Sequence, residues 1–302
     1  MGLPKSYALL PQTTVIDSPL RPTLRTPMSQ LLALTSAVFY GLGDFLGGIA
    51  TRRSSVWTVT AWSQTLGLGV LAIGLLVVPA DAVTTADILW GALAGVIGLV
   101  GLATLYSTLA SGSMTVVAPI AGATTAVIPV VVDLSQGAEL SARHWFGIGL
   151  ALGAVLLIGI DPAGKNTDTR MIGRAILAGT AFGIFFIALA QTSEASGLWP
   201  LVGARGTTIP IAFAIAGSRG VAASPRGRDL GLVALLGNLD MTANVAIALA
   251  LQRGPLGIST VLSSLYPAFT AITAVIVLRE RPRPAQTVGI VLAMGAIVAL
   301  AL

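Results

Sequence analysis

Three charged side chains interrupt stretches of sequence that are otherwise apolar: Asp44, Arg205 and Asp240. A guanidinium group binds a carboxylate through two parallel hydrogen bonds, and a buried carboxylate binds an amine or carries a proton. A charge at the centre of a bilayer costs roughly 2.5–3.5 kcal/mol on insertion scales, so it normally faces the protein interior and has a partner. Asn244 follows Asp240 by one helical turn on the same helix face. These residues predict a polar pocket between helices.

Each charge has two interpretations. Arg205 and Asp240 either line a path for a solute or form a structural ion pair that locks two helices together. Asp44 is either a protonatable carboxylate that couples solute movement to a proton gradient or a packing residue. Further candidate binding residues are Gln64, Tyr106 and Tyr266, the candidate kinks or gates are Pro210 and Pro267, and weaker candidates are Trp62, Thr124 and Thr125. A plain packing kink explains each proline as well as a gate does.

The composition is that of a protein that crosses a membrane many times. Of the 302 residues 55% are hydrophobic and 10% are charged, and the mean hydropathy is +0.89, whereas soluble domains carry about 25% charged residues. The lack of cysteine excludes disulfides and thiolate sites, and the one histidine, His144, has no histidine partner. Basic residues flank apolar stretches, which favours a role in topology over nucleic-acid binding. We expect no cofactor and no metal.

Ten apolar stretches are long enough to cross a bilayer, because its ~30 Å hydrocarbon core needs about 20 helical residues. They lie near residues 29–50, 57–78, 88–110, 115–134, 145–160, 172–192, 199–217, 230–251, 256–278 and 285–302. The sequence therefore predicts an all-α integral membrane protein with ten transmembrane helices. Residues 1–28 are polar and rich in proline, which predicts a disordered tail, and residues 161–171 form a linker loop.

The depth of each charge follows from the ~1.5 Å rise per helical residue. Arg205 lies about 9 Å below the surface at which the seventh stretch begins, and Asp240 lies near the middle of the eighth. The two side chains can therefore meet if these helices face each other. Asp44 lies about 10 Å from the opposite surface, level with Gln64. We expect Asp44 to meet Gln64 and Ser63 rather than Arg205.

An internal repeat recurs along the chain at one constant spacing. This repeat offset pairs Gly41 with Gly183, Trp57 with Trp199, Asp87 with Asp229, Gly95 with Gly237 and Gly112 with Gly254. The two copies, residues 29–160 and 172–302, each hold five stretches, an odd number, so they enter the membrane in opposite orientations. Such inverted repeats are typical of secondary transporters, whose solute site lies near the bilayer midplane between the repeats.

The two charges of the candidate pair occur in one copy only. At the repeat offset, Arg205 corresponds to Ser63 and Asp240 to Gly98. A pair that only held the scaffold together would be expected in both copies. The difference favours a site on one side of a symmetric frame.

The chain resembles the EamA-type branch of the drug/metabolite transporter superfamily over residues 29–302. The residues that carry the resemblance are Tyr40-Gly41-Leu42-Gly43-Asp44-Phe45, Leu198-Trp199-Pro200 with Ala204-Arg205, Asp240 with Asn244, Gly254, the run Leu262 to Pro267, and Leu278-Arg279-Glu280-Arg281 followed by Gln286 and Gly289. The first copy departs from the pattern, with only Ala138-Glu139-Leu140 at the boundary motif and with Thr125 in place of Pro267. The resemblance implies a transporter of the bacterial inner membrane with both termini in the cytoplasm. The distribution of basic residues instead places the odd-numbered loops in the cytoplasm and both termini outside.

These observations favour a secondary transporter that moves a small polar or zwitterionic metabolite, amino-acid-like or an organic anion, by alternating access. No nucleotide-binding loop is present in the sequence, so a gradient, with a proton as the candidate coupled ion, must drive transport. The expected partners are a small-molecule solute and the lipid bilayer, with no nucleic acid, and the protein is a monomer or a homodimer. The alternatives are an exporter of lipophilic or cationic compounds, a non-transporting membrane subunit and an intramembrane enzyme.

Overall fold

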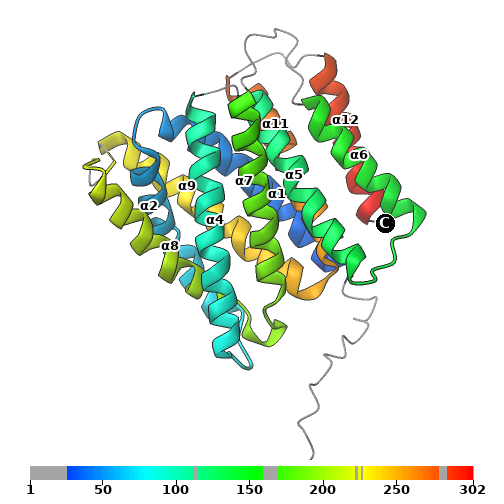
Figure 1. Cartoon of the computed structure of the whole chain (residues 1–302), viewed down its shortest axis with the longest axis horizontal. Coiled ribbons are helices and arrows are strands. Elements are labelled where there is room, and N and C mark those ends of the chain that lie inside the picture. Colours follow the sequence, from blue (N-terminus) through cyan, green and yellow to red (C-terminus); the bar gives the residue numbers. More distant parts are fainter. Residues whose placement is uncertain are drawn as a thin grey trace, which may run out of the picture.

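The computed structural model describes residues 26–111, 114–158, 169–221, 224–225, 227–278 and 284–301. Within these ranges every regular element is helical, and the helices form one bundle (Figure 1). Most of the expected tail, residues 161–168 of the expected linker, and the boundary residues Arg279, Glu280 and Arg281 lie outside the described residues. The predictions made for them are therefore not addressed by the fold.

The helices follow the order of the apolar stretches. The first repeat contains α1 (Thr26–Thr51), α2 (Val56–Leu66), α3 (Leu68–Val77), α4 (Thr85–Ser111), α5 (Met114–Ser135) and α6 (Ala142–Ile158). The second contains α7 (Thr169–Ala190), a 3-10 turn (Glu194–Ser196), α8 (Trp199–Ser218), α9 (Gly227–Arg253), α10 (Leu256–Ser263), α11 (Tyr266–Leu278) and α12 (Pro284–Ala301). Among the described residues, seven helical stretches are long and apolar enough to cross a membrane, and α6 and α12 hold shorter apolar stretches. The predicted all-helical membrane fold is confirmed, and the number of ten spans stays a prediction.

Two of the predicted spans are broken helices. In the second span α2 ends and α3 begins at Gly67, whose backbone lies so close to α9 that an added Cβ would be 2.6 Å from the Gly237 carbonyl oxygen. The ninth span divides between Ser263 and Tyr266. The interruption directly precedes Tyr266-Pro267, where a kink or gate was predicted in the ninth span, and the role as a gate stays a prediction. Pro267 occupies the first turn of α11, where its missing N–H costs no hydrogen bond.

The packing between the repeats occurs in matched pairs. Helix α1 packs on α9, and their repeat counterparts α7 and α4 pack on each other. In the same way, the contact of α4 with α8 corresponds to the contact of α9 with α2 and α3. The contact of α5 with α7 corresponds to the contact of α10 and α11 with α1. Equivalent helices also meet, as α6 and α12 do side by side at the edge of the bundle (Figure 1). The two repeats thus present the same surfaces to each other.

Asp87 and Asp229, which are related by the repeat offset, each contact a loop of the opposite repeat. Asp87, at the start of α4, accepts hydrogen bonds from the Ser193 N–H at 2.8 Å and from the Thr84 N–H and hydroxyl at 3.0 and 2.6 Å, and it is 3% exposed. Asp229, at the start of α9, pairs with Arg53 at 3.4 Å, and the Arg53 side chain is 63% exposed. The first contact is buried and extensive, and the second is solvated.

Candidate functional site

The Arg205 guanidinium joins three helices near the centre of the bundle. Its Nη2 donates to Asp240 Oδ2 on α9 at 2.9 Å, and the two side chains are 8% and 14% exposed. Its Nη1 donates to Gln64 Oε1 on α2, an oxygen that also accepts the Thr208 hydroxyl at 3.1 Å. The expected contact between the charges of the seventh and eighth spans is confirmed, and Gln64 extends it to the other repeat.

Asp44 does not meet the partners that were expected for it. The side-chain oxygen of Gln64 accepts hydrogen bonds from Arg205 and Thr208, and the Ser63 hydroxyl donates to a carbonyl of its own helix. The expectation compared the depths of the backbones alone. Gln64 lies about 12 Å and Arg205 about 9 Å from opposite ends of their helices, so their long side chains close the remaining gap across the ~30 Å core.

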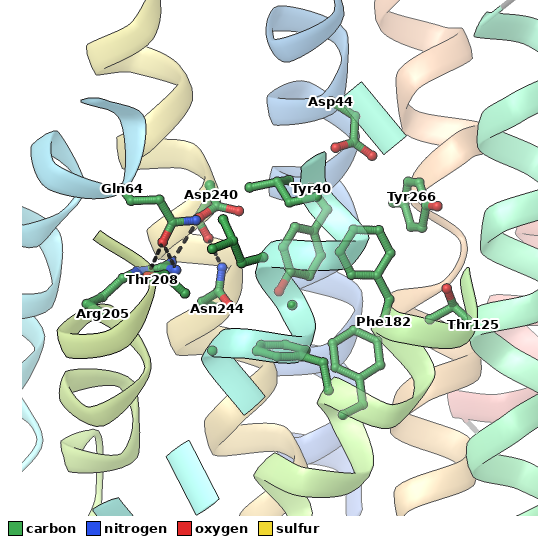
Figure 2. Close-up of a pocket in the computed structure, with 16 residues that line it drawn as sticks. Tyr40, Asp44, Gln64, Thr125, Phe182, Arg205, Thr208, Asp240, Asn244 and Tyr266 are labelled. Atoms are coloured by element: carbon green, nitrogen blue, oxygen red, sulfur yellow. Dashed lines mark hydrogen bonds and ion pairs between the residues drawn. The ribbon is translucent and has the colours of Figure 1, made fainter. Parts of the chain in front are cut away.

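The charged residues face a pocket that lies between the two repeats (Figure 2). About 630 Å³ of empty space, part of it open to the surroundings, lies inside the ring of lining residues. The lining consists of Tyr40, Asp44, Gln64, Gly95, Gly98, Leu99, Leu102, Thr125, Phe182, Phe185, Phe186, Arg205, Thr208, Asp240, Asn244 and Tyr266. Figure 2 shows Gln64, Arg205 and Asp240 gathered on one side, with Asp44 apart from them.

The pocket has a polar half and an apolar half, and the repeat relates them. Tyr40 and Asp44 on α1 correspond at the repeat offset to Phe182 and Phe186 on α7, and both pairs line the pocket. Likewise Asp240 and Asn244 on α9 correspond to Gly98 and Leu102 on α4, which also line it. Equivalent positions therefore build opposite walls, one with charges and amides and the other with rings and aliphatic side chains.

The other predicted polar residues divide into lining and packing groups. Asn244 lines the pocket and donates to the Asp240 backbone carbonyl at 2.7 Å, and Tyr266 lines it and donates to the Ala118 carbonyl at 3.4 Å. Tyr106 is 2% exposed and packs against Gly47 of α1, outside the lining set. Tyr106 therefore lies outside the lining of this pocket, and its predicted contact with a solute stays a prediction.

The predicted gating prolines do not line the pocket either. Pro210 lies inside α8, as predicted, but it is exposed on the outer surface. Pro267 packs against α5, where a Cβ added to Gly122 would lie 3.0 Å from its ring. The weaker candidate Trp62 meets Phe213 edge-on at 5.9 Å, and Thr125 lines the pocket.

Sequence reasoning missed nine lining residues. These are Tyr40, Gly95, Gly98, Leu99, Leu102, Phe182, Phe185, Phe186 and Thr208. Helical spacing could have found two of them, because Tyr40 precedes Asp44 by four residues and Thr208 follows Arg205 by three. The repeat offset could have found Phe182 and Phe186 as counterparts of the polar residues on α1. Among the described residues no group of three or more histidines, cysteines or carboxylates is placed to hold a metal ion.

Comparison with known proteins gives the family of the chain. The sequence profile of the EamA-like transporter family matches twice, over residues 27–160 and 169–302, and the starts of the two matches are related by the repeat offset. The search of curated proteins finds no match. Twenty-eight chains of solved structures match, and one of them, titled "Crystal structure of protein", is 16% identical with a TM-score of 0.70, with 90% of this chain and 95% of that chain covered. At this identity the likeness supports the fold alone. Because the two profile matches cover most of its length, the chain belongs to the EamA-like transporter family.

Proposed function

We propose that this protein is a secondary transporter of the inner membrane that moves a small zwitterionic metabolite by alternating access. The observation that carries the proposal is the buried contact between Arg205 and Asp240 at the wall of a pocket between the repeats. Buried charges of both signs in a membrane bundle mark solute or ion pathways. Membership of a transporter family supports the same class of function.

The transport cycle we propose is a rocking of residues 29–160 against residues 172–302 within ten spans of inverted topology. The matched packing pairs support it, because each of these pairs recurs when the two repeats are exchanged. A symmetric frame has two equivalent arrangements that differ in which end is open, and that is the requirement for alternating access. The break between Ser263 and Tyr266 places a turn inside the bundle, as transporter sites commonly do.

The two halves of the pocket suit a solute with a charged head and an apolar body. The Arg205 Nε is buried without a hydrogen-bond partner, so the guanidinium retains donor capacity for a solute carboxylate. Phe182, Phe185 and Leu102 offer an apolar surface in the same pocket. An amino-acid-like zwitterion with an apolar side chain can form ionic contacts with the polar wall and apolar contacts with the other wall. A purely hydrophilic ion can interact favourably with the polar wall alone.

A matched set of three solutes tests the proposal. L-leucine, 4-methylpentanoate, which lacks the amine, and 3-methylbutylamine, which lacks the carboxylate, share one hydrocarbon skeleton. In proteoliposomes that contain the purified protein, we expect uptake of L-leucine to exceed uptake of either truncated solute. Arg205→Ala should reduce L-leucine uptake by about 10- to 100-fold, the value of one or two charge-assisted hydrogen bonds. The control Arg219→Ala removes a guanidinium that lies over Trp57 outside the pocket and should have little effect.

A second candidate function is the export of lipophilic cations. Two carboxylates and one guanidinium line the pocket, and aromatic rings cover one wall, which suits an apolar cation. The same assay separates the candidates. A preference for 3-methylbutylamine that survives Arg205→Ala would replace the zwitterion proposal with this one.

A further inference from the structure

We propose that Asp44 forms a cation subsite that takes the ammonium group of the solute, separate from the Arg205–Asp240 pair. This inference rests on the proposed function and assigns one end of the solute to one side chain. It makes Asp44 a binding residue in its own right. The solute amine would then point toward α1 and its apolar body toward α7.

The carboxylate of Asp44 is the pocket charge that lacks a protein partner. It is 8% exposed, it lines the pocket, and among the described residues it has no hydrogen bond and no ion pair. Arg205 and Asp240, by contrast, satisfy each other at 2.9 Å. A buried carboxylate without a partner is strongly unfavourable unless a proton or a cation neutralises it. A cation beside Asp44 would therefore stabilise its carboxylate.

The side chains around Asp44 suit an ammonium group and disfavour an anion. Asp240 and the phenol groups of Tyr40, Tyr106 and Tyr266 lie within electrostatic range of the Asp44 carboxylate. Asp240 repels a second negative charge, and the guanidinium that lines the pocket is held by Asp240 and Gln64. The faces of aromatic rings attract a cation electrostatically.

The neighbouring hydroxyl groups leave Asp44 available to a solute. The Tyr266 hydroxyl already donates to the Ala118 carbonyl at 3.4 Å, so it is directed to the backbone of α5. Tyr106 is packed against Gly47 and does not line the pocket. In the second repeat the position of Asp44 is held by Phe186. Among the described lining residues, the carboxylate without an ion pair therefore lies on the α1 wall, and this difference between α1 and α7 orients a solute that has one charged amine and one apolar end.

Carbodiimide labelling of the purified full-length protein tests the subsite without any need for transport. Dicyclohexylcarbodiimide modifies carboxyl groups in apolar surroundings, and mass spectrometry locates the modified residue. We expect Asp44 to be labelled faster than Asp240, because Arg205 shields the latter. A primary amine or a free carboxylate would itself react in the presence of the carbodiimide, so the competitors are the quaternary N,N,N-trimethyl-3-methylbutylammonium and the neutral 4-methylpentanamide. Excess of the ammonium should slow labelling of Asp44 by at least tenfold, whereas the amide should not.

Each outcome of the labelling decides the inference. Equal protection of Asp44 by the ammonium and by the neutral amide would overturn it. If Asp44 is labelled and neither solute protects it, the carboxylate carries a proton and does not bind the amine. If the ammonium still protects Asp44 but the protein does not take up L-leucine, the proposed function fails and the subsite remains supported.

Asp44→Asn provides the second measurement. Removal of one charged hydrogen-bond acceptor should weaken binding of 3-methylbutylamine by about 10- to 100-fold. Binding of 4-methylpentanoate should change by less than about threefold, because its carboxylate would face Arg205. The control Glu139→Gln removes an exposed carboxylate outside the pocket and should change neither affinity. Equal weakening of both solutes would show that Asp44 serves the fold and not the amine.

Discussion

At the scale of single residues, the ion pair between Arg205 and Asp240 is a poor source of stability. Both charges lose most of their contact with water, and their attraction repays that cost only when the geometry is good. Apolar residues of similar size commonly replace such a pair without loss of stability. This cost favours the proposed role of the pair in solute binding over a role in joining helices alone.

The first residue-scale prediction separates the two roles. Arg205→Met alone and Asp240→Leu alone should each lower the stability of the folded protein by about 3–5 kcal/mol, because each leaves a buried charge without its partner. The double variant should regain most of this loss and still fail to transport L-leucine. Thermal unfolding in detergent and uptake in proteoliposomes measure the two effects. A double variant that transports normally would show that the pair is structural.

Residue type and depth predicted part of this site. The cost of burying charge was enough to identify Asp44, Arg205 and Asp240, and it also implied that the last two meet. The same reasoning failed for Gln64, because the reach of its side chain across the bundle is not visible in a depth estimate. The aromatic wall was missed since Phe182, Phe185 and Phe186 carry no polar signal that distinguishes a pocket from lipid or core.

At the scale of elements, close backbone contact between α2 and α9 positions the polar half of the pocket. A Cβ added to Gly237 of α9 would overlap the Ser63 carbonyl oxygen of α2. Gly67, one turn after Ser63, lies against the Gly237 carbonyl oxygen. Gly237 precedes Asp240 by three residues, and Gln64 follows Ser63 directly. The distance between these two helices therefore decides whether Gln64 and Asp240 both reach Arg205.

A pair of glycine substitutions in α9 tests this contact. Gly237→Ala should force α2 away and lower stability by about 1–3 kcal/mol, with a loss of solute binding. Gly231→Ala lies in the same helix with no atom within 4 Å of an added Cβ, and it should be neutral or stabilising by up to about 1 kcal/mol. Thermal unfolding and L-leucine binding provide the readouts. Equal effects of the two substitutions would contradict the close-contact explanation.

The broken helices show where apolar patterning stops being informative. The second and ninth apolar stretches were each predicted as one span, because hydropathy records burial in lipid and not continuity of the backbone. Gly67 did not predict the boundary between α2 and α3, because glycine is common within membrane helices. Pro267 did indicate a change in the ninth span, but its position in the first turn of α11 depends on tertiary packing and could not be read from the sequence.

At the scale of the whole molecule, the repeat is the strongest prediction from sequence. The repeat offset recurs in the two family matches and in the matched packing of α1 on α9 and α4 on α7. The opposite orientation of the two repeats in the bilayer stays a prediction. The sequence contains no cysteine, so single-cysteine variants have no background reactivity.

Two exposed residues related by the offset provide a direct test of orientation. Arg52 lies after α1 in the first repeat, and Glu194 lies after α7 in the second. With inverted repeats, a membrane-impermeant maleimide added to intact cells should label either Arg52→Cys or Glu194→Cys and not both. The variant that is protected should become reactive after the cells are opened. Labelling of both from one side would contradict the inverted arrangement.

The contacts of Asp87 and Asp229 give the molecule unequal barriers at its two loop contacts. Release of the Ser193 loop breaks a charged hydrogen bond in a buried setting, worth about 1.5–3 kcal/mol. Release of the Arg53 loop breaks a solvated pair worth about 0–1 kcal/mol. In the proposed transport cycle, the same position of the repeat would therefore release slowly in one half and quickly in the other. We expect unequal rates of solute entry from the two sides of the membrane.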